Sequence, residues 1–345
     1  MPHGTVAVND ERYCRLMLPK VSRTFALTIR LLPPGLGYTV TIAYLLCRIA
    51  DTIEDAANME PAARVSLLTR FRDTLADASM DAAPLRIAFA GATVPDQALV
   101  RDSDNVLREY WRLSREKREA IRPSVQEMCD GMASFVMSFA ARSGQVRMLD
   151  SVAELERYCY YVAGTVGHLL TRLFILHGRR LPSARTDRLW TLSTRFALGL
   201  QVTNILQDIA ADAERGVGFV PHELLAQGQG DAGCPRPTAP ALNALVELAL
   251  ARLWDAIDYC ACLPRNQYRI RLFCLAAPYF AVRTLRSVQV QLESGLAQPR
   301  PKISRAAVYR TLVVTILVAP SNKLMRAYFG LLAGGVRVTS RTHRD

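Results

Sequence analysis

Long apolar runs are missing from this chain, although half of its 345 residues are hydrophobic. The nearest candidate for a membrane span, residues 308–318, is shorter than the roughly 20 residues that a helix needs to cross a bilayer, and Pro320 interrupts the chain directly after it. The first ten residues lack an apolar core preceded by positive charge, so we expect no signal peptide. These absences favour a globular protein with a large core of its own.

The cysteine spacing of a zinc site is also missing. The eight cysteines are scattered through apolar, helix-like contexts, and the one close pair, Cys260 and Cys262, does not have the spacing of zinc ligands. Scattered cysteines of this kind are typical of reduced core residues, so we expect a cytoplasmic protein.

Strand-like alternation is nearly absent, and apolar residues recur at helical intervals throughout the chain. The pattern predicts an all-α fold with one domain over residues 1–345, in which residues 337–345 form a disordered tail. Residues 33–35 (Pro-Pro-Gly) separate two helices, residues 91–104 predict a polar connection, and residues 227–240, rich in Gly and Pro, predict a flexible loop. The predicted helices cover residues 10–19, 22–32, 36–55, 60–79, 97–114, 116–142, 151–178, 185–212, 240–262, 266–294 and 304–334.

Basic residues outnumber acidic ones by 43 to 31, which gives a net charge of +12. They are dispersed and come without the aromatic signatures of RNA-binding domains or the spacing of zinc fingers, so we predict no nucleic-acid partner. An anionic substrate fits this charge, and so does a peripheral contact with the acidic cytoplasmic face of a membrane. The alternative is that the basic charge has no functional meaning and only reflects a genome that uses arginine codons often.

Two pairs of carboxylates are the most informative feature of the sequence. Asp51 with Asp55, and Asp208 with Asp212, lie four residues apart at the ends of apolar stretches that are typical of buried helix. Like charges stacked on one helix face repel unless a cation lies between them. Hard oxygen ligands favour Mg²⁺, which proteins hold with a few carboxylates and substrate phosphates. The alternative for a single pair is a solvated acidic face.

Ionisation of a prenyl diphosphate is a reaction that uses two acidic helices, Mg²⁺ and an apolar interior. The metal ions neutralise the diphosphate as it leaves, and a dry hydrocarbon pocket protects the allylic cation from water. The two acidic helices are therefore predicted to face one central apolar cavity.

Several further segments resemble the squalene/phytoene synthase family, in the spelling typical of its squalene-forming members. The most specific is Tyr158 to Gly167, which is similar to the family's YCxYVAGxVG helix. The resemblance covers most of the chain and implies an isoprenoid-synthase-type helical bundle. The other segments are residues 21–26 (VSRTFA), 44–55 (YLLCRIADTIED), 201–212 (QVTNILQDIAAD), 219–221 (FVP) and 302–305 (KISR).

Roles for individual residues follow from this resemblance alone. It implies metal binding, directly or through water, by Asp51, Glu54, Asp55, Asn204, Asp208 and Asp212. It implies catalytic roles for Tyr158, Tyr44 and the four aspartates. Tyr158 would assist ionisation or accept a proton. The substrate- and cofactor-binding residues that it implies are Ser22, Arg23, Phe25, Arg48, Val162, Gly164, Gln201, Asn204, Lys302 and Arg305.

Four positions depart from the family pattern. Gln207 replaces an arginine before the second motif's aspartate, Ala211 replaces an acid, and Val217 and Ser304 replace basic residues. A neutral side chain at position 207 cannot provide the planar fork that binds phosphate bidentately. Some of these positions serve NADPH or the second diphosphate in the family, so the departures bear on the use of a reductant.

The resemblance implies head-to-head condensation of two farnesyl diphosphates through presqualene diphosphate to squalene, with reduction by NADPH. One alternative is a non-reducing synthase that makes dehydrosqualene or phytoene. A second is a terpene cyclase that acts on one prenyl diphosphate. A third is a protein that binds prenyl diphosphate or lipid without catalysis.

Overall fold

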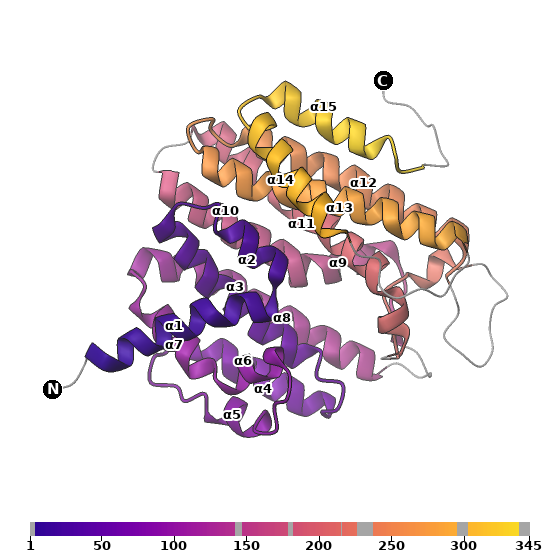
Figure 1. Cartoon of the computed structure of the whole chain (residues 1–345). Helices are drawn as coiled ribbons and strands as arrows, with labels where there is room; N and C mark the ends of the chain where they lie inside the picture. Colours follow the sequence, from indigo (N-terminus) through magenta and orange to yellow (C-terminus); the bar gives the residue numbers. More distant parts are fainter. Residues whose placement is uncertain are drawn as a thin grey trace. The chain divides into compact units, whose positions relative to one another are not determined.

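The computed structural model describes residues 4–141, 147–178, 182–214, 216–225, 237–294 and 303–337. These residues are almost all helical, which confirms the all-α prediction (Figure 1). The exceptions among regular elements are two-residue strands, β1 (Arg147–Met148) and β2 (Val217–Gly218), which pair in parallel. Lys302 and the predicted tail beyond Arg337 lie outside the described residues, as does most of the predicted loop at 227–240.

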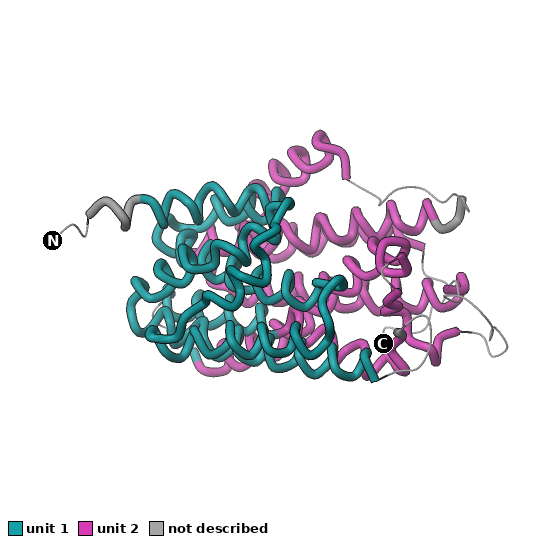
Figure 2. Tube along the Cα trace, turned by 90° about the horizontal axis from the view of Figure 1, so that it is seen from below, with its two compact units in different colours: residues 1–141, 165–182 teal, residues 142–164, 183–345 magenta. Residues whose placement is uncertain are grey.

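The chain divides into two compact units, which Figure 2 shows in separate colours. The prediction of a single domain stays a prediction. Unit 1 comprises residues 1–141 and 165–182 and contains α1 (Gly4–Val21), α2 (Arg23–Ile29), α3 (Pro34–Glu54), α4 (Pro61–Thr74), α5 (Ala83–Ala88), α6 (Pro95–Arg101), α7 (Ser103–Arg112), α8 (Arg115–Ala141) and α10 (Thr165–Gly178). Unit 2 comprises residues 142–164 and 183–345 and contains β1, α9 (Val152–Cys159), the π-helix η1 (Tyr160–Gly164), α11 (Ser183–Glu214), β2, the 3₁₀-helix η2 (His222–Leu224), α12 (Ala239–Cys262), α13 (Tyr268–Ser294), α14 (Arg305–Val318) and α15 (Asn322–Ala333).

Helix α3 lies in the core of unit 1, where it packs against α1, α4, α6, α7, α8 and α10. Pro34 occupies its first turn, where a missing backbone N–H costs nothing. Leu45, Leu46 and Ile49 are fully buried, and burial of each such side chain contributes about 1.5–3 kcal/mol. The apolar face therefore fixes the rotation of α3 and the direction in which its acidic last turn points.

Two described helices have the length and composition of a membrane span. This corrects the expectation that no segment of the chain is long and apolar enough to cross a membrane. The two helices are α3 and the continuous helix Val152–Gly178. In α3 the apolar window is 72% buried, as in the core helix of a globular unit. In Val152–Gly178 the window is 44% buried. A search for uninterrupted runs does not identify these helices, because charged residues occur within each of them.

Unit 2 is built on the long pair α11 and α12, which pack along each other. Gly199 allows their close approach, because a Cβ atom there would lie 3.0 Å from the backbone of Arg252 and Leu253. Any larger side chain at position 199 would push the two helices apart. α11 carries the second acidic pair, so this contact bears on the placement of that pair.

Some predicted helices are divided in the structure. Residues 97–114 form α6 and α7, which meet at Asp102, and residues 304–334 form α14 and α15, separated at residues 319–321. Ser321 ends the second gap by capping α15, since its hydroxyl accepts from the Leu324 N–H at 3.4 Å. Helix α5 was not predicted, and α4 ends at Thr74 rather than at 79.

A buried ion pair joins α1 to α7 in unit 1. Asp10, 1% exposed, accepts two hydrogen bonds from Arg108, at 2.9 and 2.8 Å, and one from Arg112 at 3.1 Å. Burial raises the pKa of Asp10, but the hydrogen bonds and charges of both arginines outweigh it and hold the pKa below its usual value. Because the pKa of Asp10 is lower in the folded protein, its ion pairs stabilise the fold fully above the unfolded-state pKa, near 4. This stabilisation is lost as the pH falls through the folded-state pKa.

We expect Asp10→Asn to lower the free energy of unfolding by about 2 kcal/mol at pH 7, because both arginines lose a charged partner but remain partly hydrated. Below about pH 3 the difference from the wild type should shrink. Urea titrations at both pH values measure it. Asp130→Asn, which removes an exposed partner of Arg72, is the control and should change stability by less than about 0.5 kcal/mol. Equal losses in the two variants would contradict the prediction.

Candidate active site

The last turn of α3 carries the first acidic pair. Asp51 is half-buried, Glu54 ends the helix and is 9% exposed, and Asp55 caps it in an exposed position. The Asp55 N–H donates to the Asp51 carbonyl oxygen at 2.9 Å, so the two aspartates occupy one turn. The sequence prediction that they share one helix end is confirmed.

Arg48 holds Asp51 from the preceding turn. Its Nη1 donates to Asp51 Oδ2 at 2.8 Å, and its Nε donates to Asp96 Oδ1 at 2.7 Å. Burial raises the pKa of Asp51 to about 6, Arg48 opposes this shift, and the charge of Asp55 adds to it. The carboxylates at this helix end therefore repel each other, and a further cation beside them would relieve that repulsion.

An aromatic and hydroxyl cluster borders the acidic turn. The ring centroids of Phe25 and Tyr44 lie 5.0 Å apart, and Ser22 caps α2 by accepting from the Phe25 N–H at 3.2 Å. Burial raises the pKa of Tyr44 to about 12. The structure thus joins Ser22, Phe25 and Tyr44 to the Arg48–Asp51 pair, whereas Arg23 is exposed at the start of α2.

Asp96 belongs to this cluster and was not predicted. It lies in the first turn of α6, and it is the second carboxylate that Arg48 contacts. The prediction of a polar connection over residues 91–104 is wrong for this segment. The sequence Val94-Pro95-Asp96 carries a helix-start signal, proline followed by an acid, that could have located the helix but not its partner.

We expect Asp96→Ala to raise the KM for the anionic substrate that the sequence predicts by about tenfold, because Arg48 would lose one of the two carboxylates that orient it. Steady-state kinetics measure the effect, and a thermal melt checks the fold. Asp104→Ala, which removes an ion pair with Arg86 elsewhere in the same unit, is the control and should leave KM unchanged. An unchanged KM in Asp96→Ala would show that this carboxylate does not position Arg48.

Tyr158 lies at the end of α9 in unit 2. It is 5% exposed and stacks on Phe219, with ring centroids 4.6 Å apart and an interplanar angle of 26°. Phe219 follows β2, so the short strand pair helps to place the ring that covers the tyrosine. An apolar ring over a phenol holds its position and keeps its surroundings dry.

A π-helical turn follows Tyr158 directly. The predicted single helix over 151–178 is continuous, but Tyr160–Gly164 form the π-helix η1. A Cβ at Gly164 would lie 2.8 Å from Cδ2 of Tyr160, so glycine makes room for that ring. The side chain of Val162 is buried in the same turn. Single π-turns within α-helices occur frequently at functional sites.

Helix α11 carries the remaining predicted residues on one face. Gln201, Asn204, Asp208 and Asp212 are separated by three, four and four residues, which places them above one another. Asp212 is 4% exposed, Gln201 and Asp208 are half-buried, and Asn204 is exposed. α11 packs against both α9 and η1, so the second acidic pair and Tyr158 belong to contacting elements of one unit.

The four departures occupy ordinary structural positions. Ser304 caps α14, where its hydroxyl accepts from the Ala307 N–H at 3.2 Å, and Val217 lies in β2 opposite Arg147. Gln207 is half-buried and Ala211 exposed on α11. Arg305 is exposed at the first residue of α14. The basic element at 302–305 is thus represented in the described chain by Arg305 alone.

The donor chemistry of both helix ends fits Mg²⁺. Within the described residues no group of three or more His, Cys, Asp or Glu side chains is arranged as a metal cage. Each helix instead offers a pair of carboxylates, which suits an ion that retains water and takes further oxygens from substrate phosphates. The two pairs belong to different units, so their facing one cavity stays a prediction.

The helices of the described residues form an all-α fold of the isoprenoid-synthase type, and two of them carry acidic pairs. Residues 18–307 match the family model for squalene/phytoene synthase, and the chain belongs to that family.

Named relatives support the same family. The chain is 31% identical over 284 residues to the squalene synthase ERG9 of Saccharomyces cerevisiae and 30% identical over 283 residues to a squalene synthase of Schizosaccharomyces pombe. Each match covers 80% of this chain, but 61% and 59% of the two relatives, so the chain spans about three fifths of their length.

Solved structures share the fold. A complex of TcSQS with the ligand BPH1237 superimposes with a TM-score of 0.78, at 25% identity, over 97% of this chain and 94% of that chain. A dehydrosqualene synthase in complex with a ligand gives a TM-score of 0.62 over 94% of this chain and 98% of that chain, at 18% identity.

Proposed function

We propose that this protein is a Mg²⁺-dependent prenyltransferase that condenses two farnesyl diphosphates head to head, through presqualene diphosphate, to squalene. The observation that carries the proposal is the acidic turn of α3, where Asp51 and Asp55 share one turn and Asp51 pairs with an Arg48 that Asp96 orients. The similarity to fungal squalene synthases supports it.

The first half-reaction begins with ionisation of one farnesyl diphosphate. The bond between its first carbon and oxygen breaks, and the electron pair leaves with the diphosphate. Bound Mg²⁺ supplies charge neutralisation of this leaving group. In our proposal Asp51, Glu54 and Asp55, with Asn204, Asp208 and Asp212, hold the metal ions. Arg48 contributes a fixed cation beside Asp51, which needs no reorganisation as charge develops.

The second farnesyl diphosphate then attacks the allylic cation through its double bond, and loss of a proton closes the cyclopropane of presqualene diphosphate. We assign Tyr158 to the leaving group or to this proton. Its stacking on Phe219 and its burial favour a fixed position in dry surroundings. Val162 and Gly164 in η1, and Gln201 on α11, are proposed to border the prenyl chains.

The second half-reaction removes the remaining diphosphate, rearranges the skeleton and ends with hydride delivery from NADPH. Lys302, Arg305, Arg23 and Arg48 are the basic residues that we propose for phosphate groups in this step. A second candidate is a non-reducing synthase that releases dehydrosqualene or phytoene. Ser304, which caps a helix, and the neutral residues Gln207 and Val217 favour it, because they replace basic side chains that would bind phosphate.

Diphosphate release separates an enzyme from a binding protein. Purified full-length protein incubated with farnesyl diphosphate should release inorganic diphosphate with Mg²⁺ present and should not do so with excess chelator. Release of one diphosphate per substrate without a coupled product would favour a terpene cyclase. Absence of any release, with the substrate still bound, would overturn the proposal in favour of a binding protein.

We further propose that the protein acts at the cytoplasmic face of a membrane, as a peripheral protein without a nucleic-acid partner. Farnesyl chains and a C30 hydrocarbon partition into lipid, so a site close to the bilayer shortens the path of substrate and product.

A further inference from the structure

Helix α14 has its apolar and polar faces reversed with respect to the usual pattern of a surface helix. Thr311 and Thr315 face inward and are 0% and 1% exposed, whereas Tyr309, Val313 and Leu317 face outward and are 63%, 58% and 68% exposed. The two threonine hydroxyls donate to the carbonyl oxygens of the preceding turn at 2.7 Å, so both buried hydroxyls are hydrogen-bonded. A helix exposed to water normally places such residues the other way round.

Contacts with α13 hold this reversed face in place. Tyr268 donates through its hydroxyl to the Ile316 carbonyl oxygen at 2.8 Å, and buried Arg271 donates through Nε to the Ala319 carbonyl oxygen at 3.0 Å. Ile316 itself is 47% exposed. The outward apolar side chains therefore belong to an anchored helix, and their exposure to water is unfavourable as long as the surface is uncovered.

The neighbouring helix α15, which packs against α14, extends the apolar surface. Leu324 and Leu331 lie seven residues apart on one face and are 53% and 75% exposed. We call the exposed apolar side chains of these two helices the α14–α15 face. Its members are Tyr309, Val313, Ile316, Leu317, Leu324 and Leu331.

The charged side chains carried by the segment that contains α14 and α15 have one sign. Residues 303–337 contain five basic residues and no acidic residue. Arg326 is neutralised by Asp258 at 2.8 Å, but Arg305, Arg310 and Lys323 are exposed and form no ion pair with any described residue. An apolar surface bordered by unpaired cations complements an anionic lipid surface, not water and not a second basic copy of the same face.

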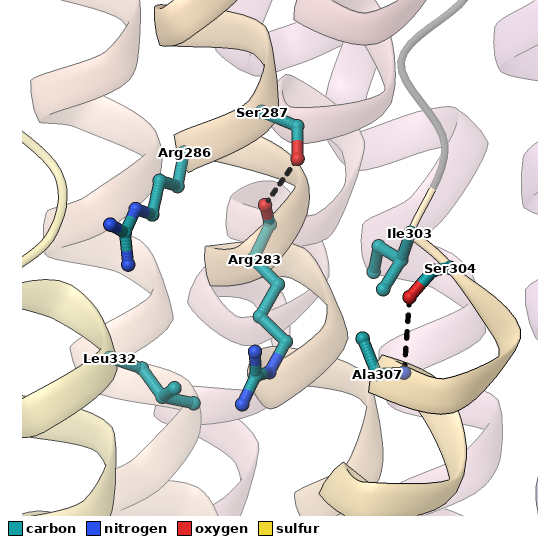
Figure 3. Close-up of a pocket in the computed structure, with 7 residues that line it drawn as sticks. All are labelled: Arg283, Arg286, Ser287, Ile303, Ser304, Ala307 and Leu332. Carbon is teal, nitrogen blue, oxygen red and sulfur yellow. Dashed lines mark hydrogen bonds between the residues drawn. The ribbon is translucent and has the colours of Figure 1, made fainter.

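A cavity of about 240 Å³ lies between α13, α14 and α15 (Figure 3). Arg283 and Arg286 extend from α13 into it, with Leu332 of α15 on one side and Ser304 at the start of α14 on the other. Arg283 donates to the Tyr328 hydroxyl at 3.2 Å. Within the described residues neither arginine has a carboxylate partner, so their charge is available to a phosphate.

We propose that the α14–α15 face docks on an anionic membrane, with its apolar side chains in the interfacial region and a lipid phosphate in the Arg283–Arg286 cavity. The inference rests on the proposed function for its purpose, since an enzyme that takes up prenyl chains and releases a hydrocarbon gains from contact with lipid. The evidence for the surface itself is independent of catalysis. It consists of the reversed helix, the single sign of charge and the unpaired arginines.

Vesicle cosedimentation of the full-length protein, without substrate, tests the proposal. The wild type should bind vesicles of phosphatidylcholine mixed with phosphatidylglycerol and bind pure phosphatidylcholine at least tenfold more weakly. Val313→Ser with Leu317→Ser should weaken binding to the mixed vesicles by tenfold or more. Arg283→Gln with Arg286→Gln should weaken it by about fivefold for each charge removed, and should hardly change binding to pure phosphatidylcholine.

Matched controls lie in unit 1, where Ile87→Ser removes a side chain that is 74% exposed and Arg12→Gln removes an exposed charge. Both should bind mixed vesicles like the wild type.

Equal binding by the α14 variant and the Ile87→Ser control would overturn the proposal, and so would a wild type that does not bind. A concentration-dependent dimer that only Leu317→Ser dissociates would also overturn it, because a second copy would then cover the face. Diphosphate release from detergent-dispersed substrate, measured on the same variants, reports on the proposed function separately and should not change.

Discussion

Asp208→Asn is expected to lower Mg²⁺-dependent turnover by about three orders of magnitude or more while leaving the fold intact. The change keeps the size of the side chain but removes the charge that holds a metal ion against the departing diphosphate, a contribution of several kcal/mol to the transition state. Asp51→Asn should have an effect of the same order. Diphosphate release at saturating substrate measures both, and circular dichroism checks the helices.

Asp187→Asn is the matched control, because Asp187 is exposed near the start of the same helix, α11. It should turn over at the wild-type rate. Raising the Mg²⁺ concentration should restore part of the activity of Asp208→Asn and none of the activity of a misfolded variant. Wild-type turnover in either Asp51→Asn or Asp208→Asn would remove the acidic pairs from the mechanism.

Tyr158→Phe is expected to lower kcat by about 10²–10⁴-fold with little change in KM, because a hydroxyl that acts on the leaving group or on a proton contributes in the transition state and not in the bound substrate. The ring itself is retained, so stacking on Phe219 should persist. Single-turnover kinetics with farnesyl diphosphate measure the chemical step directly.

Tyr161→Phe serves as the control, since Tyr161 lies three residues further on, in the π-helical turn. It should retain most of its activity. A Tyr158→Phe protein that melts several degrees earlier but keeps its specific activity would identify Tyr158 as a structural residue, and the proton would then need another acceptor.

Features that depend on local sequence could be predicted well. The start of α3 follows from Pro33 and Pro34, and its burial follows from an apolar stretch that ends at the first acidic pair. The pairing of Asp51 with Asp55 needed only helical geometry. The same reasoning located α11 within about two residues at each end.

Features that depend on tertiary contacts could not be predicted. Asp96 reaches Arg48 from a helix 48 residues away in sequence, and no pattern of residue types records such a pairing. The π-turn at Tyr160–Gly164 arises from a shift in backbone hydrogen bonding within a helix whose apolar periodicity continues unchanged. The reversed faces of α14 could not be predicted for a related reason. Its sequence is apolar on several sides, so which side is exposed depends on the contacts with α13.

The departures at Gln207, Val217 and Ser304 bear on the second diphosphate and on the reductant. Loss of three phosphate-binding side chains weakens a reductant site unless other basic residues replace them. Arg305 is exposed at the start of α14, and Lys302 lies outside the described residues. Phosphate binding by Arg23, Arg48, Lys302 and Arg305 therefore stays a proposal.

The central claim, head-to-head condensation ending in reduction, is tested most directly by identifying the hydrocarbon made from farnesyl diphosphate and Mg²⁺, with and without NADPH. Gas chromatography with mass spectrometry should show squalene when NADPH is present, and presqualene diphosphate (as its alcohol after phosphatase treatment) or dehydrosqualene when it is absent. A C30 product that is the same at millimolar NADPH and without it would contradict reduction and place the protein with the non-reducing synthases, and a C15 product would contradict the condensation itself.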